Sequence, residues 1–192
     1  TFTELNYRIY IKDNPILNAK DYGMPQNRPR LFVIGIRNDI ECDDFIFPVE
    51  EELKTKVKDY LFENNKVDPI YYLGQKGFEF VTNPKYKNRA QINSNIMQCQ
   101  KANQQFNWNG EFVFIPYNEI KDNKEVLSKA YVAEYNGVKG VCRKLTPEEC
   151  VRLMGFSNDF VFPNTVPDVW RYRQSGNSIV VNIFERIIPN LI

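Results

Sequence analysis

The sequence predicts an α/β fold with regular stretches at both ends and an irregular, mostly β stretch between them. Residues 1–66 hold an alternating stretch at 6–12 and a continuous apolar run at 31–36, and both patterns are typical of strands. Residues 67–139 are polar, aromatic and irregular, with only short apolar runs. Residues 140–192 become regular again and carry two helical patterns.

The first stretch is expected to form two strands joined by a loop. Residues 6–12 alternate in part between apolar and polar side chains, which predicts a strand. The run Leu31–Ile36 is apolar throughout, as in a strand buried on both faces. Glycine and proline punctuate residues 22–30 between them, which predicts a loop. Residues 53–62 are expected to form an amphipathic helix.

The middle stretch has a composition suited to contact with nucleic acid. From Asn88 to Asn109 there are 22 residues, of which 11 are Asn or Gln. The wider stretch 82–109 has no Asp or Glu and four cations, which are Lys85, Lys87, Arg89 and Lys101. Amide side chains pair with adenine edges, and Lys or Arg meets phosphate or guanine. A solvated polar loop is the competing interpretation. Short β runs are expected at 112–115 and 131–133.

The last stretch predicts two helices. Thr146, Pro147 and Glu149 form the start of the first, because threonine caps, proline suits the first turn and the glutamate closes a capping box. Gly155 is expected to end this helix. The apolar spacing from Ser178 to Ile188 predicts the second helix, buried on one side.

Composition excludes several classes of protein. The net charge of +1 means that bulk charge alone does not hold DNA, so any contact must come from local patches. The sequence contains no run of 18 apolar residues, so no membrane span is expected, and it contains no secretory leader, so no export is expected. Without histidine and without C-x-x-C spacing, neither a metal site nor a His-dependent triad is expected. The four free thiols fit a reducing bacterial cytoplasm.

Two short motifs carry candidate chemistry. Arg28 and Arg30 alternate before the apolar run, so their guanidiniums are expected to point the same way and to clamp an anion or carbonyl. The alternative is a solvated edge with ordinary ion pairs. In the stretch 174–178, Gly176 permits close backbone approach, and a following helix amino terminus would offer N–H groups to a carboxylate or phosphate. The alternative there is an ordinary capped helix.

Three segments resemble conserved blocks of the bacterial cytosine-C5 DNA methyltransferases. Residues 17–30, with the core Gln-x-Arg-x-Arg, resemble the eighth block. Residues 143–156 resemble the ninth, and residues 174–180, with Gln-Ser-Gly-Asn-Ser, resemble the tenth. The segments occur in the family's order, with a variable region between the eighth and the ninth.

The resemblance implies the carboxy-terminal part of a Rossmann-like, S-adenosylmethionine-dependent methyltransferase domain with an inserted target-recognition domain. It implies that residues 1–66 and 140–192 belong to the catalytic domain and that 67–139 choose the DNA sequence. Such enzymes flip the target cytosine out of the duplex. By resemblance, Arg30 contacts that cytosine, Arg28 supports the same site, and Asn177 and Ser178 hold the methionine end of the cofactor.

The resemblance also implies double-stranded DNA as the partner. Lys85, Lys87, Arg89 and Lys101 would meet the DNA, and Arg143 would belong to the same interface at the base of the recognition domain, which it would organise. The alternative function is a sequence-specific DNA-binding module without catalytic activity.

The sequence departs from the family in its early blocks. It has no Phe-x-Gly-x-Gly, Pro-Cys-Gln or Glu-Asn-Val motif. Cys99 lies in Gln-Cys-Gln without the proline and after the eighth block, so it is expected to be structural or DNA-facing, and Cys150 is expected to pack on its helix. We therefore expect the isolated chain to be inactive and to expose an apolar edge and face. We expect either a tight partner chain, with the amino-terminal catalytic half as the candidate, or self-association.

Overall fold

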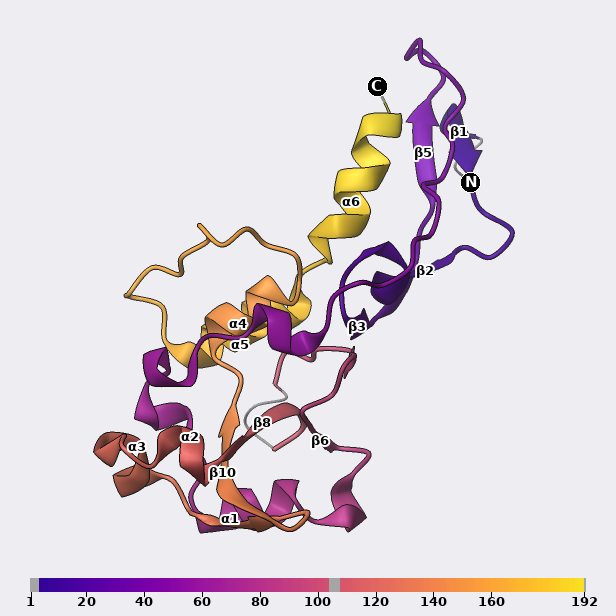
Figure 1. The fold of residues 1–192 in the computed structure, drawn as a ribbon. Helices are drawn as coiled ribbons and strands as arrows, with labels where there is room; N and C mark the ends of the chain where they lie inside the picture. Colours follow the sequence, from indigo (N-terminus) through magenta and orange to yellow (C-terminus); the bar gives the residue numbers. More distant parts are fainter. Residues whose placement is uncertain (1–3, 104–107, 192) are drawn as a thin grey trace.

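The computed structural model describes residues 4–103 and 108–191 (Figure 1). The expected nucleic-acid contacts at residues 104–107 of the Asn- and Gln-rich stretch lie outside the described residues. A small α/β unit with both chain termini lies at one end of the molecule, and a four-stranded sheet lies at the other, with two helices between them (Figure 1). The architecture is the mixed α/β fold that the sequence predicts.

Two antiparallel strand pairs build the amino-terminal unit. β1 (Tyr7–Tyr10) pairs with β5 (Ile34–Arg37), and β2 (Ile16–Asn18) pairs with β4 (Pro29–Leu31). The expected strand at residues 6–12 is confirmed.

The prediction of one strand buried on both faces over residues 31–36 is wrong. The run divides between β4 and β5, each of which pairs with a single strand, and side chains on one face stay exposed. Leu31 is 65% exposed and Val33 is 41% exposed, whereas Ile36 is 7% exposed. The apolar surface that the sequence predicts is therefore present on this unit.

The helix α6 (Val181–Ile187) covers the other face of these strands (Figure 1). Its buried side chains Ile183 and Ile187 pack with Leu17 and Ile36 in one apolar cluster. The predicted helix at 178–188 is therefore present but begins three residues later, because residues 178–180 link it to the preceding helix.

Residues 53–62 do not form the expected helix. Only a 3-10 turn, Val57–Tyr60, is present. The backbone N–H groups bond elsewhere, since Val57 donates to the Asn95 carbonyl and Phe62 donates to the Glu149 carboxylate. These long-range bonds replace the bonds to residue i−4 that a helix requires.

The central sheet has the strand order β6 (Ala90–Ile92), β8 (Gly110–Pro116), β10 (Val138–Lys144) and β9 (Ala133–Tyr135). The first pair is parallel and the other two pairs are antiparallel. The predicted β run at 112–115 lies within β8, and the run predicted at 131–133 is displaced to β9.

Each face of the central sheet carries its own apolar cluster. Phe112 and Phe114 of β8 pack with α1 (Gln75–Val81), whereas Val113 and Ile115 pack with Met97 on the opposite face. This alternation follows from the period of two along a strand. Two short helices, α2 (Tyr117–Ile120) and α3 (Lys124–Lys129), follow β8.

The helix α4 (Pro147–Arg152) begins and ends as predicted. Thr146 Oγ1 accepts from the Glu149 N–H at 3.1 Å, and Glu149 Oε2 accepts from the Thr146 N–H at 2.8 Å. Gly155 ends the turn with φ of +85°, a conformation that glycine adopts at little cost. Cys150 is fully buried, as expected.

The helix α5 (Asp168–Asn177) lies against α4 and was not predicted from the sequence. No helix within residues 4–103 and 108–191 is long and apolar enough to cross a membrane.

Candidate functional site

A cleft of about 410 Å³ brings together the four residues expected at the catalytic and cofactor sites, Arg28, Arg30, Asn177 and Ser178. Two segments line it, residues 28–34 and residues 177–184, which lie far apart in the sequence. Its wall is partly aromatic, because Phe32 and Phe184 pack with their ring centroids 5.6 Å apart. The cleft thus combines cations, amide and hydroxyl groups with an apolar surface.

Arg28 is 5% exposed and holds the cleft together. Its Nη1 donates to the Gln100 carbonyl at 2.8 Å. Its Nη2 donates to the carbonyls of Gly176 at 3.1 Å and Ser178 at 2.8 Å. Burial lowers the pKa of this guanidinium from its ordinary value, although an arginine stays charged in proteins. Arg28 therefore links three segments, and its donors are largely used within the protein.

Arg30 is exposed and keeps more of its guanidinium available to a ligand. Its Nη1 donates to the Pro29 carbonyl at 2.7 Å, and its Nη2 lies 3.4 Å from the Cys99 sulfur. Arg28 Nη1 lies 3.3 Å from the same sulfur. The two arginines thus converge on one side of the chain, as their alternation predicts.

Gln26 positions the segment that carries Cys99 and Gln100. β3 (Gln26–Asn27) pairs in parallel with β7 (Met97–Gln98). Gln26 is fully buried, its Oε1 accepts from the Gln100 N–H at 3.0 Å, and its Nε2 donates to the Leu153 carbonyl at 2.9 Å. The local sequence indicates Gln26 only as part of the arginine motif, because its positioning role depends on a partner 74 residues away.

The motif around Gly176 is placed differently from the prediction. Gly176 and Asn177 form the last turn of α5, so the prediction that they precede a helix amino terminus is wrong. The first N–H of α6, from Val181, donates to the Met154 carbonyl. Close backbone approach is confirmed, because a Cβ on Gly176 would lie closer than 3.0 Å to the backbone of Lys101 and Ala102.

Substitution Gly176→Ala is expected to lower the free energy of unfolding by about 1–3 kcal/mol, the usual range for overpacking. The added methyl would push the segment at residues 101–102 away and weaken the Arg28 bond to the Gln100 carbonyl. Urea unfolding measures the change. Gly74→Ala is the matched control, since its Cβ would meet no atom within 4 Å. Equal stability of the two variants would contradict the close contact.

The four expected DNA-contacting cations of the middle stretch are all exposed. Arg89 and Lys101 line a small hollow together with Cys99, beside the converging arginines. Lys87 lines a different hollow next to β9, and Lys85 stacks over the Tyr86 ring at 5.7 Å. The structure therefore brings two of the four next to the cleft.

Direct contact between Arg143 and DNA is excluded in this structure, which corrects that prediction. Arg143 is fully buried and pairs with Glu149 through two hydrogen bonds of 2.8 Å. Glu149 also accepts from the Phe62 N–H at 2.9 Å. A buried arginine needs a charged partner, and the capping glutamate of α4 supplies it. The contacts of Arg143 are those of a residue that organises the junction between β10 and α4.

The four thiols should differ sharply in reactivity. Burial raises the pKa of Cys142 to about 12 and raises that of Cys150 as well, so neither forms thiolate near pH 8. Cys42 and Cys99 are partly exposed. Iodoacetamide at pH 8 is expected to modify two thiols per folded chain, as measured by mass spectrometry, and duplex DNA should slow modification of Cys99 alone. Modification of Cys142 in the folded chain would contradict this.

Comparison with known proteins decides the family. A family model described as C-5 cytosine-specific DNA methylase matches residues 1–192. The chain belongs to this family. Among curated relatives, the type II methyltransferase M.HhaI of Haemophilus parahaemolyticus is 32% identical over 100% of this chain and 55% of its own length. The type II methyltransferase M2.ScrFI of Lactococcus lactis subsp. cremoris is 35% identical over 92% of this chain and 44% of its own length.

The chain spans about half the length of the curated methylases it matches. Solved structures show the same fold. A DNMT2 variant from Spodoptera frugiperda matches 99% of the chain with a TM-score of 0.68 at 18% identity, covering 59% of that structure. The Entamoeba histolytica methyltransferase EhMeth matches 99% of the chain with a TM-score of 0.65 at 20% identity, covering 55% of that structure.

Proposed function

We propose that this chain recognises a short DNA sequence and completes the active site of a cytosine-C5 DNA methyltransferase. The observation that carries the proposal is the cleft in which Arg28, Arg30, Asn177 and Ser178 meet. Arg30 offers an exposed guanidinium for the flipped cytosine, and Arg28 fixes the backbone around it. The curated relatives are type II methyltransferases, so the proposed setting is bacterial restriction–modification in the cytoplasm.

The cleft is proposed to hold the methionine end of S-adenosylmethionine. Ser178 Oγ donates to the Ser175 carbonyl at 2.9 Å, which leaves its lone pairs free to accept from an ammonium group. Asn177 is exposed at the same wall and offers both a donor and an acceptor. The bound cofactor would supply an electrophilic methyl group. The residues of this chain would orient its amino-acid part and shield it with the apolar wall.

The central sheet and its loops are proposed to choose the target sequence. Residues 67–139 form the proposed recognition domain, flanked by catalytic parts at 1–66 and 140–192. β10 crosses the boundary between residues 139 and 140 and connects the sheet to α4. Arg89 and Lys101, beside Cys99, would contact DNA next to the flipped base.

The open apolar surface of the amino-terminal unit supports a tight partner. Its exposed large apolar side chains include Leu5, Ile9, Ile11, Ile16, Leu31 and Val33. Many exposed apolar side chains on one small unit favour a partner that covers them. The proposed partner is the remaining catalytic part of the enzyme, with the Pro-Cys-Gln nucleophile and further strands of the sheet, on the same or another polypeptide.

Transfer of a labelled methyl group from S-adenosylmethionine to DNA tests the proposal. The chain would be assayed alone and mixed with a matching amino-terminal half, with equal amounts of each protein. Activity is expected only in the mixture. Activity of the chain alone would refute the need for a partner, with Cys99 the first residue to substitute. No methyl transfer in either assay, together with sequence-specific DNA binding, would favour a recognition module without catalysis.

A further inference from the structure

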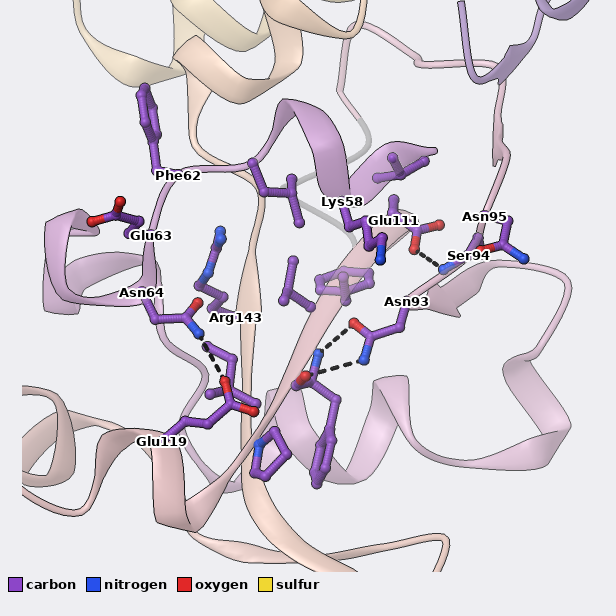
Figure 2. A pocket seen from close by; sticks show the side chains of 17 residues that line it. Lys58, Phe62, Glu63, Asn64, Asn93, Ser94, Asn95, Glu111, Glu119 and Arg143 are labelled. Atoms are coloured by element: carbon purple, nitrogen blue, oxygen red, sulfur yellow. Dashed lines mark hydrogen bonds between the residues drawn. The ribbon is translucent and has the colours of Figure 1, made fainter. Parts of the chain in front are cut away.

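A second cavity, of about 590 Å³, lies against the central sheet (Figure 2). One wall is β8, and the opposite wall is the segment 57–64. It shares no lining residue with the active-site cleft. Its volume falls within the roughly 300–1,000 Å³ typical of small-molecule sites.

Glu111, near the start of β8, lines this cavity with a carboxyl group that lacks one hydrogen-bond partner. The residue is 1% exposed. Its Oε1 accepts from the Ser94 N–H at 2.7 Å (Figure 2), and its Oε2 is buried with no hydrogen-bond partner in the described part of the chain. Burial raises the pKa of this carboxyl to about 7, although the bond from Ser94 opposes the rise. A buried carboxylate oxygen without a donor is unfavourable, so the site favours a hydrogen-bond donor or a cation.

The charges of the lining favour a cation over an anion. Three carboxylates line the cavity, those of Glu63, Glu111 and Glu119, against the cations Lys58 and Arg143. Arg143 is already neutralised by its bidentate pair with Glu149, and Glu63 pairs with Lys66 outside the lining, which leaves Glu111 and Glu119 against Lys58. The lining therefore keeps a net negative charge and repels phosphates and carboxylates.

The remaining lining distinguishes among cations. Apolar side chains from both walls face the cavity, including Val57, Leu61, Val113 and Ile115. No group of three or more His, Cys, Asp or Glu side chains within residues 4–103 and 108–191 could hold a metal ion. The combination of one carboxylate and an apolar strip suits an ammonium group on a hydrocarbon chain.

We propose that this cavity binds a small aliphatic amine through its ammonium group. The ammonium group donates to Glu111 Oε2, and the methylene chain lies against the apolar side chains of the two walls. The inference does not depend on the methyltransferase function, because its test needs neither DNA nor the cofactor.

The cavity lies where three segments are tied together. The Ser94 N–H donates to Glu111. The side-chain amide of Asn93 bonds to the backbone of Phe114 in β8, with Oδ1 accepting from the N–H at 3.0 Å and Nδ2 donating to the carbonyl at 3.1 Å. The Asn95 carbonyl accepts from the Val57 N–H at 3.0 Å. An amine on Glu111 would therefore strengthen the attachment of residues 93–95, and with them the segment that leads to Cys99 and the active-site cleft.

Isothermal titration of the folded chain with putrescine tests the proposal. Between pH 8 and pH 6 the dissociation constant is expected to rise about tenfold, because a carboxyl with a pKa near 7 is mostly ionised at the first pH and mostly protonated at the second. The amine stays protonated at both. Sodium butyrate, an anion of similar size, should not bind, and potassium chloride at matched ionic strength should give no comparable heat.

Three variants separate the site from general charge attraction. Glu111→Gln keeps the acceptor for the Ser94 N–H and should abolish binding. Lys58→Gln removes a competing cation from the opposite wall (Figure 2) and should tighten binding. Glu52→Gln, at an exposed position outside the cavity, should bind as the unchanged chain does. Binding that is absent, equal at both pH values, or unaffected by Glu111→Gln would overturn the proposal, and a melting curve for each variant confirms that it is folded.

Discussion

Substitution of Arg143 by alanine is expected to lower the free energy of unfolding by about 3–5 kcal/mol, the usual effect of breaking a buried ion pair. Removal of the guanidinium leaves the Glu149 carboxylate buried without its counter-charge. Glu149 would keep only its bonds from the N–H groups of Phe62 and Thr146. Urea unfolding followed by circular dichroism gives the change directly.

The control for this prediction is the exposed pair of Lys66 and Glu63, whose side chains are 65% and 70% exposed. Lys66→Ala should change stability by less than about 0.5 kcal/mol, because solvent screens such pairs. A double-mutant cycle with Glu149→Gln isolates the coupling of the buried pair. If Arg143→Ala costs no more than Lys66→Ala, the organising role of Arg143 is refuted.

Substitution Arg30→Ala is expected to lower the rate of methyl transfer by the complemented enzyme about 100- to 1,000-fold, as for loss of one preorganised donor at a reacting group. The stability of the chain should change little, because Arg30 is exposed and donates only to Pro29 and Cys99 within the described residues. Initial rates at saturating cofactor measure the effect.

Two further variants serve as comparisons for Arg30→Ala. Arg37→Ala removes an exposed arginine that pairs with Asp39 outside the cleft, and should leave the rate unchanged. Arg28→Ala should differ from Arg30→Ala, because it removes the guanidinium bonds to the carbonyls of Gln100, Gly176 and Ser178 and so reduces stability as well. A complemented Arg30→Ala enzyme with an unchanged rate would rule out the proposed contact with cytosine.

Local chemistry explains what the sequence analysis predicted correctly. The capping box of α4 uses side chains and N–H groups within four residues, so the sequence alone determines its start. β1 and the centre of β8 carry enough apolar residues to identify strands. The alternation of Arg28 and Arg30 likewise predicts that both guanidiniums point the same way, and both reach the Cys99 sulfur.

Long-range bonding explains what the sequence analysis missed. Residues 53–62 have a helical pattern, but the N–H of Val57 bonds to a carbonyl on a distant segment. α5 buries only Tyr172, Ser175 and Gly176, so it lacks the apolar stripe by which a helix is recognised. The carbonyl of Gln100 reaches Arg28 across 72 residues, a contact that no local pattern indicates.

The buried pair of Arg143 and Glu149 has a consequence for exchanging target specificity between methylases. The pair spans the junction of β10 and α4, and the Phe62 N–H completes it from a third segment. A chimera spliced between residues 143 and 149 would join an arginine and a glutamate that were never packed together. Splice points before β10 keep both partners from one parent. We expect viable hybrids to cluster at such points.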